Sequence, residues 1–334
     1  MKKCFIIALG AIALVACTKT SVSYEQTGEI GFAPVVRKNS TKAAVQGATF
    51  PEQNIKVFGY YDNSMPVNSA YDAGKFAVEY LPGVEFAKKG TNWAGATTPY
   101  YWPKTGSMLF AGYSPVDFTG VTFSLASNKF SVAECSQPEF SATKDLLYAG
   151  YTTSVLGGTA PMTFSHALSW VTIKAKAAAA DQIKITNIKF VGLAATAFST
   201  GLPEWSVSGT KEQLNVFAPT SAFAVPAAET LVESNENCGL VFPQALENAA
   251  EIIVSYEMNN GAGKWFAQAP FVAQLNLLTS NEGANTIDKW EAGKHYTYII
   301  NFSAIGEPGS ANEIKINPSI TDWTPVTADG ISAN

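Results

Sequence analysis

The chain has 334 residues, of which 15% are Asp, Glu, Lys or Arg, against about 25% in average soluble proteins. Its 47% hydrophobic and 12% aromatic residues argue against intrinsic disorder. The net charge is −5 and Arg37 is the only Arg, so we expect no nucleic-acid partner. Two His without a Cys/His cluster argue against a zinc enzyme, and we expect neither metal nor cofactor. The composition is typical of an all-β surface protein.

The N-terminus has the features of an export signal. Lys2 and Lys3 precede an uncharged apolar run at 5–16, which is too short for a membrane span of about 20 residues. The run ends in Leu-Val-Ala-Cys and resembles a bacterial lipobox. This resemblance implies cleavage between Ala16 and Cys17 and acylation of the Cys17 thiol. An ordinary signal peptide with a chance Cys is the alternative. We therefore expect a signal peptide at 1–16, a tether at 17–28 and an outer-membrane lipoprotein anchored through acylated Cys17.

Short alternating runs of β-branched and aromatic residues recur between Gly, Asn, Pro and Asp. They predict an all-β fold of antiparallel sandwiches, with strands within 55–61, 108–113, 170–175, 183–185, 188–191, 252–256 and 296–300. The length suggests two domains, and the Ala-rich stretch at 177–180 is the best junction. The predicted domains are 29–178 and 181–323, followed by a tail at 324–334. One short helix is expected at 242–250.

No motif of the chain predicts catalysis. The segment 258–265 fails as a phosphate loop at both ends and reads instead as a hairpin around Asn260-Gly261. His166 is a candidate general base, but no nucleophile elbow accompanies it, so we expect a structural residue bonded to a sheet edge. His295 adjoins a predicted strand, and we expect it at an exposed or edge position. We therefore predict no enzymatic activity.

Cysteines and aromatic residues leave alternatives open. Cys135 and Cys238 fall in different predicted domains; buried free thiols are favoured, although an oxidising compartment also permits a disulfide. The aromatic residues Trp93, Tyr100, Tyr101 and Trp102 are expected in core and edge packing, with a sugar-stacking face as the alternative.

Six motifs follow one another along the chain. They are Pro-Tyr-Tyr-Trp-Pro-Lys-Thr-Gly at 99–106, Leu-Phe-Ala-Gly-Tyr-Ser-Pro at 109–115, Asp-Leu-Leu-Tyr-Ala at 145–149, Phe-Ser-His-Ala-Leu-Ser at 164–169, Trp-Glu-Ala-Gly-Lys-His-Tyr-Thr-Tyr at 290–298 and Ile-Thr-Asp-Trp at 320–323. This ordered set resembles the fimbrillins of the Bacteroidetes, and the resemblance spans about residues 30–323. It implies two tandem transthyretin-like β-sandwich domains and a subunit of surface fibres that serve adhesion.

The resemblance also implies a route of assembly. In this family the precursor travels as a lipoprotein, an Arg-specific protease removes the first strand, and a strand of a neighbouring subunit fills the open groove, a form of β-augmentation. Here the first strand would be 29–36, with Ile30, Phe32 and Val36 on one face, and the cut would fall between Arg37 and Lys38. The expected partners are other fimbrial subunits, the protease, the outer membrane and a host or bacterial surface receptor.

The C-terminal tail fits this route poorly. Residues 324–334 are short and polar, with only Val326 and Ile331 as sizeable apolar side chains. The segment 313–323 is the alternative donor; otherwise the subunit is a tip, accessory or anchor component. Two other hypotheses compete with the fimbrial one: a surface glycan-binding lipoprotein without a fibre role and, ranked last, a secreted hydrolase.

Overall fold

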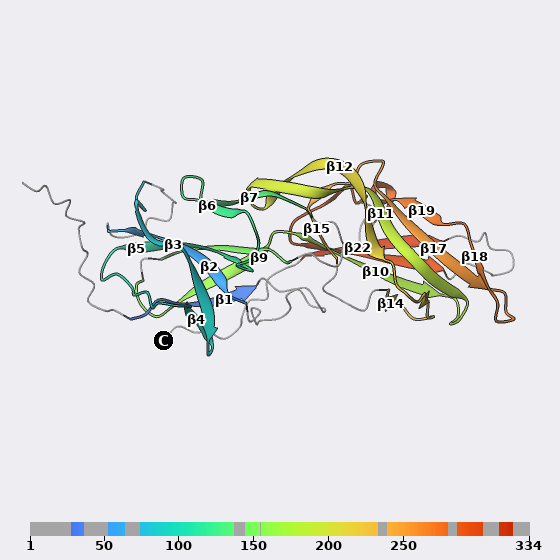
Figure 1. Ribbon diagram of the computed structural model, residues 1–334, viewed down its shortest axis with the longest axis horizontal. Helices are drawn as coiled ribbons and strands as arrows, with labels where there is room; N and C mark the ends of the chain where they lie inside the picture. The colour runs from blue at the N-terminus through green and yellow to red at the C-terminus, as the bar shows by residue number, and fades with distance from the viewer. Residues whose placement is uncertain are drawn as a thin grey trace, which may run out of the picture.

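The computed structural model describes residues 28–36, 53–63, 74–136, 144–153, 155–232, 239–279, 286–302 and 314–322. Strands dominate these ranges, and a single turn of 3-10 helix, η1 (Leu275–Leu277), is the one helical element in them. The all-β prediction is therefore confirmed. Figure 1 shows an elongated molecule with the early strands at one end and β18 at the other.

The first half of the chain supplies nine strands in the described ranges. They are β1 (Gly31–Val36), β2 (Ile55–Asp62), β3 (Val78–Lys89), β4 (Asn92–Gly95), β5 (Ser107–Ser114), β6 (Val121–Ser124), β7 (Lys129–Ser136), β8 (Leu147–Thr153) and β9 (Thr159–His166).

The second half supplies the others. They are β10 (Ser169–Ala177), β11 (Ile183–Gly201), β12 (Glu204–Phe217), β13 (Phe223–Ala224), β14 (Thr230–Leu231), β15 (Leu240–Val241), β16 (Gln244–Ala245), β17 (Glu251–Asn259), β18 (Trp265–Ala267), β19 (Phe271–Gln274), β20 (Lys289–Trp290), β21 (Lys294–Phe302) and β22 (Lys315–Asp322).

Seven strands of the first half close into a barrel in the order β1-β4-β3-β2-β5-β8-β9. Its interior is filled by aromatic and aliphatic side chains, among them Phe32, Phe86, Phe110, Trp102 and Phe164. Every residue of β5 is buried, because one face of this strand lines the barrel core while the other packs under β6 and β7. This two-sided burial explains the continuous apolar run of β5 in the sequence.

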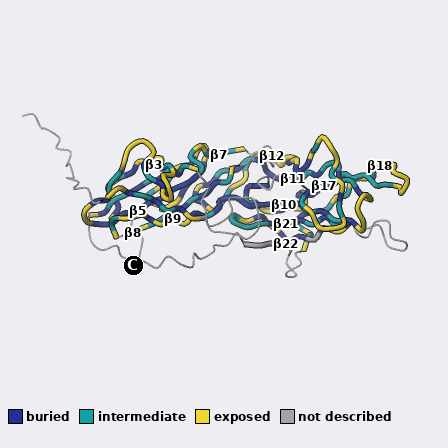
Figure 2. Tube along the Cα trace, turned by 90° about the horizontal axis from the view of Figure 1, so that it is seen from below, coloured by how far each residue is buried: buried dark blue, intermediate teal, exposed yellow. Residues whose placement is uncertain are grey.

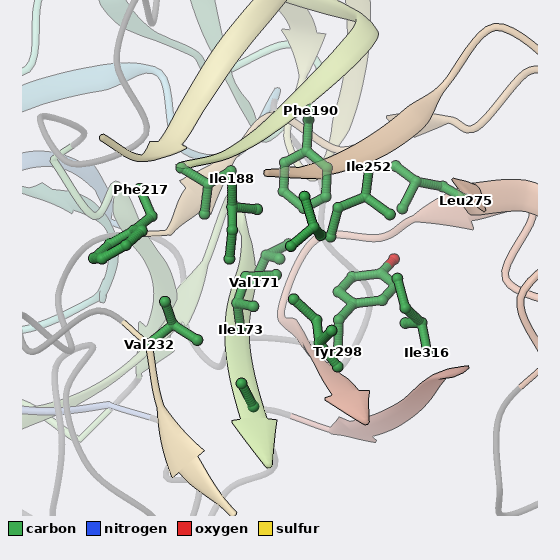
Figure 3. Close-up of a cluster of buried hydrophobic side chains, with 14 of the residues drawn as sticks. Val171, Ile173, Ile188, Phe190, Phe217, Val232, Ile252, Leu275, Tyr298 and Ile316 are labelled. Atoms are coloured by element: carbon green, nitrogen blue, oxygen red, sulfur yellow. The ribbon is translucent and has the colours of Figure 1, made fainter. Parts of the chain in front are cut away.

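The second half builds its core between two sheets. One has the order β14-β10-β21-β22, with β15 also on β10, and the other has the order β18-β17-β11-β7-β6, with β12, β13 and β19 alongside. Their facing side chains form the largest apolar cluster, in which Val171, Phe190, Ile252 and Tyr298 meet (Figure 3). Alternating residues of β21 point into this cluster, as the period of two requires.

The long strand β11 joins the two halves. Its first part pairs with β17, and its last part pairs with β7, Thr196 lying opposite Ser136. Figure 2 shows β7, β12 and β11 one after another through the middle of the molecule. The two halves therefore share one sheet.

The domain limits 29–178 and 181–323 and the transthyretin-like topology remain proposals. Strand β10 pairs with β14, β15 and β21, all of which come later in the chain. Within the proposed division, this pairing favours a boundary between β9 and β10, at residues 167–168, over one at 177–180.

Two local expectations have clear outcomes. The helix expected at 242–250 is wrong, because Gln244 and Ala245 form β16 and pair with β20. The Gln244 side chain explains why: it accepts a hydrogen bond from Ala194 N and donates one to Ala194 O, and so holds this segment against β11. The expected hairpin is confirmed between β17 and β18, with Gly261 at a φ of 80° in its turn.

Candidate functional site

The first strand lies between two others and closes the barrel. β1 runs parallel to β9 over six paired positions, from Gly31 opposite Thr159 to Val36 opposite Phe164. On its other side it meets β4 antiparallel at one position, where Phe32 lies opposite Trp93. β1 thus lies between β9 and β4 in the sheet. Its removal would leave unpaired edges on both of these strands.

Side chains of β1 fill the barrel core. Ile30 and Phe32 are fully buried. The Phe32 ring meets Phe86 and Phe110 edge to face, with ring centroids 4.8 Å and 5.1 Å away. Pro34 is buried as well, so the inward side chains of this segment are Phe32 and Pro34 within β1 and Ile30 directly before it. Sequence reasoning missed Pro34, although its alternation with Phe32 was the available signal.

The energetic weight of this strand is large. Burying a side chain such as Ile or Phe stabilises the folded state by about 1.5–3 kcal/mol. The segment of β1 and the residue before it bury Ile30 and Phe32, in addition to the backbone hydrogen bonds of the strand. Without β1, a groove lined by Phe86, Phe110 and Met162 would face water beside two open strand edges. Such a groove has the chemistry of a site that accepts an extended apolar strand.

The aromatic segment before β5 holds the start of β1. Ile30 N donates to Tyr100 O at 2.7 Å, and Trp102 N donates to Gly28 O at 3.0 Å. Trp102 is 1% exposed, and its indole N–H donates to Gly158 O. Tyr100 and Tyr101 are partly buried, and Tyr80 Oη donates to Tyr101 O at 2.5 Å. The segment 100–102 therefore holds the start of β1 in place through backbone hydrogen bonds.

The burial of the tryptophan rings argues against a sugar-stacking face. Trp93 is 4% exposed, its indole N–H donates to Gln53 O, and Lys88 Nζ lies 5.7 Å from its ring centroid. Core packing is therefore confirmed for Trp93 and Trp102, whose buried rings offer no open face to a sugar, while Tyr100 and Tyr101 are partly buried.

Several predicted site residues lie outside the described residues. These are Ala16 and Cys17 at the expected lipidation site and Arg37 and Lys38 at the expected maturation site. The backbone of Val36 is paired with Phe164, while its side chain is not among those described. The maturation site thus follows directly after the last paired residue of β1, and the tail 324–334 also lies outside the described ranges.

The two histidines have structural surroundings. His166 is buried, and its Nδ1 lies 2.9 Å from Asp145 Oδ2, so a carboxylate is one partner of this ring. The exposed or edge position expected for His295 is wrong. Its ring stacks on Trp170 with centroids 3.6 Å apart, and its Nε2 lies 3.0 Å from Thr172 Oγ1. Burial, with a smaller contribution from Lys174, lowers the pKa of His295 to about 3.

The described ranges hold no cluster of His, Cys, Asp and Glu suited to a metal and no helix long and apolar enough to cross a membrane. Cys135 is a free, partly buried thiol whose Sγ lies 3.5 Å from Ala197 O, and burial raises its pKa to about 11; Cys238 lies outside the described residues.

Comparison with known proteins gives a consistent picture. A family model described as fimbrillin-like matches residues 41–323. No curated protein matches the chain.

Solved structures share the fold at low sequence identity. A fimbrial protein from Bacteroides vulgatus has 15% identity and a TM-score of 0.56, covering 88% of this chain and 99% of its own. A candidate cell adhesion protein from Bacteroides ovatus has 15% identity and a TM-score of 0.52 over 90% of this chain and 99% of its own. One from Bacteroides uniformis has 16% identity and a TM-score of 0.51 over 89% and 98%.

Proposed function

Because the chain belongs to the fimbrillin-like family, whose members are non-enzymatic structural proteins of cell-surface fimbriae, we propose that it is exported as a lipoprotein and joined to its neighbours by strand exchange. Family membership itself implies assembly with other fimbrial subunits and a cell-surface location. The proposal adds acylation of Cys17, a cut after Arg37, loss of β1 and an adhesive role toward a host or bacterial receptor.

The position of β1 carries this proposal. It is the first strand of the barrel, and Arg37 follows its last residue. One cut there would separate residues 17–37 from the rest of the chain, after which only non-covalent contacts hold β1. Arg37 is the only Arg of the chain, so an Arg-specific protease has a single site.

The segment 313–322 is the donor that the sequence favours. Residues 29–36 read Glu-Ile-Gly-Phe-Ala-Pro-Val-Val, and residues 313–320 read Glu-Ile-Lys-Ile-Asn-Pro-Ser-Ile. The inward side chains of β1 thus correspond to Ile314, Ile316 and Pro318, which are also buried. Figure 3 shows Ile316 pointing toward the same core as Tyr298. The pattern of β22 therefore repeats the pattern that the groove already accepts.

Strand direction supports the same donor. β21 pairs with β10 in parallel and ends at Phe302, opposite Ala177. This is the end of the molecule away from the barrel (Figure 1). A released β22 would be tethered there by 303–313, a length of chain that reaches roughly 40 Å when extended. Its N-terminal end would lie at the outer rim of the next barrel, which is the end at which β1 begins. The exchanged strand would therefore run in the same direction as β1.

Cleavage is tested by the N-terminus of the subunit in isolated fibres. The expected N-terminus is Lys38, while an acylated Cys17 in fibre subunits would contradict the loss of β1. Arg37→Lys keeps the charge but removes the Arg-specific site, so we expect at least a tenfold loss of fibres. Replacing 37–38 with the site of an unrelated protease should restore fibres only when that protease is added.

The donor is tested with a peptide of residues 313–322. Added to the protein cleaved after Arg37, it should displace the 17–37 fragment, which mass spectrometry detects. A control peptide carrying Ile314→Asp and Ile316→Asp should not displace it, because a charge would enter the groove unpaired. Equal displacement by both peptides would exclude 313–322 as the donor.

A further inference from the structure

Exposed large apolar side chains mark the outer end of the barrel. Strand pairing identifies the residues at this end, because Met108 lies opposite Thr153 and Tyr61 lies opposite Val78. At this rim Val78 is 52% exposed and Val155, just past the end of β8, is 77% exposed. β1 begins at the same rim, because Gly31 lies opposite Thr159 at the start of β9.

The opposite end of the molecule carries an exposed aromatic side chain on the β17–β18 hairpin. Phe266 is 51% exposed, and its neighbour Trp265 is covered by Lys184, whose Nζ lies 4.0 Å from the ring centroid. The hairpin is fixed to the start of β11, where Asn259 N donates to Gln182 O at 2.9 Å. Figure 2 shows exposed chain at this tip beside β18.

The exit of the donor segment lies at the hairpin end as well. β21 ends at Phe302 beside the end of β10, and the turn after β10 leads to Gln182, which holds the hairpin. A strand that leaves from Phe302 and enters a second barrel at its outer rim keeps these two ends of successive copies within the reach of the 303–313 tether, roughly 40 Å when extended. The apolar side chains at both ends would then face each other around the exchanged strand.

We propose that Phe266 of one subunit packs on Val155 of the next copy of this chain, forming a second contact beside the exchanged strand. This inference rests on the strand exchange proposed above. It assigns one exposed apolar side chain from each end to a single interface, and it makes the β17–β18 hairpin the part that fixes the angle between neighbours.

Disulfide trapping tests the contact in assembled fibres. The double variant Phe266→Cys with Val155→Cys should give a ladder of covalent oligomers after oxidation, at least tenfold more than Val207→Cys with Val155→Cys. Val207 is the matched control, since it is 43% exposed but pairs with Ala197 in the shared sheet, away from both ends. The unsubstituted chain corrects for the native Cys135 and Cys238.

The outcomes separate the two proposals. Fibres that form normally but cross-link no better than the control overturn the hairpin contact and leave strand exchange intact. If the unsubstituted, cleaved chain forms no fibres, strand exchange fails, and the contact fails with it.

A second variant guards against poor assembly of the cysteine variants. Phe266→Asp should slow fibre elongation at least tenfold with an unchanged free energy of unfolding, whereas Val207→Asp should elongate normally. Normal elongation of Phe266→Asp overturns the contact.

Discussion

β1 and β22 share a sequence pattern but have different surroundings. β1 has β9 on one side and β4 on the other and closes a barrel over an aromatic core. In the described ranges β22 pairs with β21 alone, over eight positions, and forms the edge of its sheet. Removing β1 would open a closed ring, whereas removing β22 would take Ile316 out of the core and make β21 the new edge. Under the proposed strand exchange, the enclosed strand would leave the acceptor groove and the edge strand would be the donor.

The largest expected effect comes from truncating the enclosed strand. Phe32→Ala should lower the free energy of unfolding by about 3–5 kcal/mol, because it leaves a cavity against Phe86 and Phe110. Chemical denaturation of the full chain measures this change. Val35→Ala is the matched control on the same strand, since Val35 is 37% exposed, and should cost under about 0.5 kcal/mol. Equal costs for the two variants would contradict the buried role of Phe32.

The corresponding change in the edge strand should be smaller. Ile316 is buried at 9% exposure, and Ile316→Ala should cost about 2–3 kcal/mol, at the lower end for such truncations. The same denaturation experiment compares it directly with Phe32→Ala. A cost above that of Phe32→Ala would show that β22 is the more firmly held of the two strands and would argue against its release.

Acid should weaken the sheet of β22 through His295. The folded pKa of about 3 lies below the unfolded value of about 6.5, so the unfolded state binds the proton more readily. This contribution of His295 to stability is therefore almost complete above pH 6.5 and declines as the pH falls toward 3, by about 3 kcal/mol at pH 4.5. His295→Gln should remove this part of the pH dependence, which denaturation at pH 7 and pH 4.5 measures. An unchanged pH dependence in the variant would contradict the assignment.

The smallest effect concerns the sheet shared by both halves. With its pKa raised to about 11, Cys135 should react with an alkylating agent at pH 8 at least tenfold more slowly than an exposed thiol. Its reactivity should stay unchanged after cleavage at Arg37 and loss of β1, if the opening is confined to the groove. Mass spectrometry of the alkylated peptide measures the rate, and a marked increase would show that loss of β1 also loosens the shared sheet.

Local patterns predicted much of this fold. The runs 55–61, 108–113 and 296–300 are strands because their β-branched and aromatic residues alternate between turn residues. The first strand was also expected from sequence, and Ile30 and Phe32 are inward as predicted. These features depend on neighbouring residues and are therefore readable along the chain.

What could not be predicted depends on contacts between distant segments. The runs 183–185 and 188–191 belong to one strand, β11, whose later part pairs with β7. No local pattern encodes that pairing. His295 likewise looked peripheral because the residue that stacks on it, Trp170, is far away in the sequence. Pro34 was missed because Pro is rare inside sheets, yet β1 accommodates it.

The parallel pairing of two strands has a mechanical consequence. β9 and β10 follow one another with only Ala167 and Leu168 between them, and each runs parallel to a partner, β1 or β21. Two hydrogen bonds from other segments hold this connection: Trp205 Nε1 donates to Ala167 O, and Gly293 N donates to Leu168 O. In a fibre under tension, a strand seated like β1 would be pulled along its length, so that its hydrogen bonds with β9 share the force and do not open one at a time.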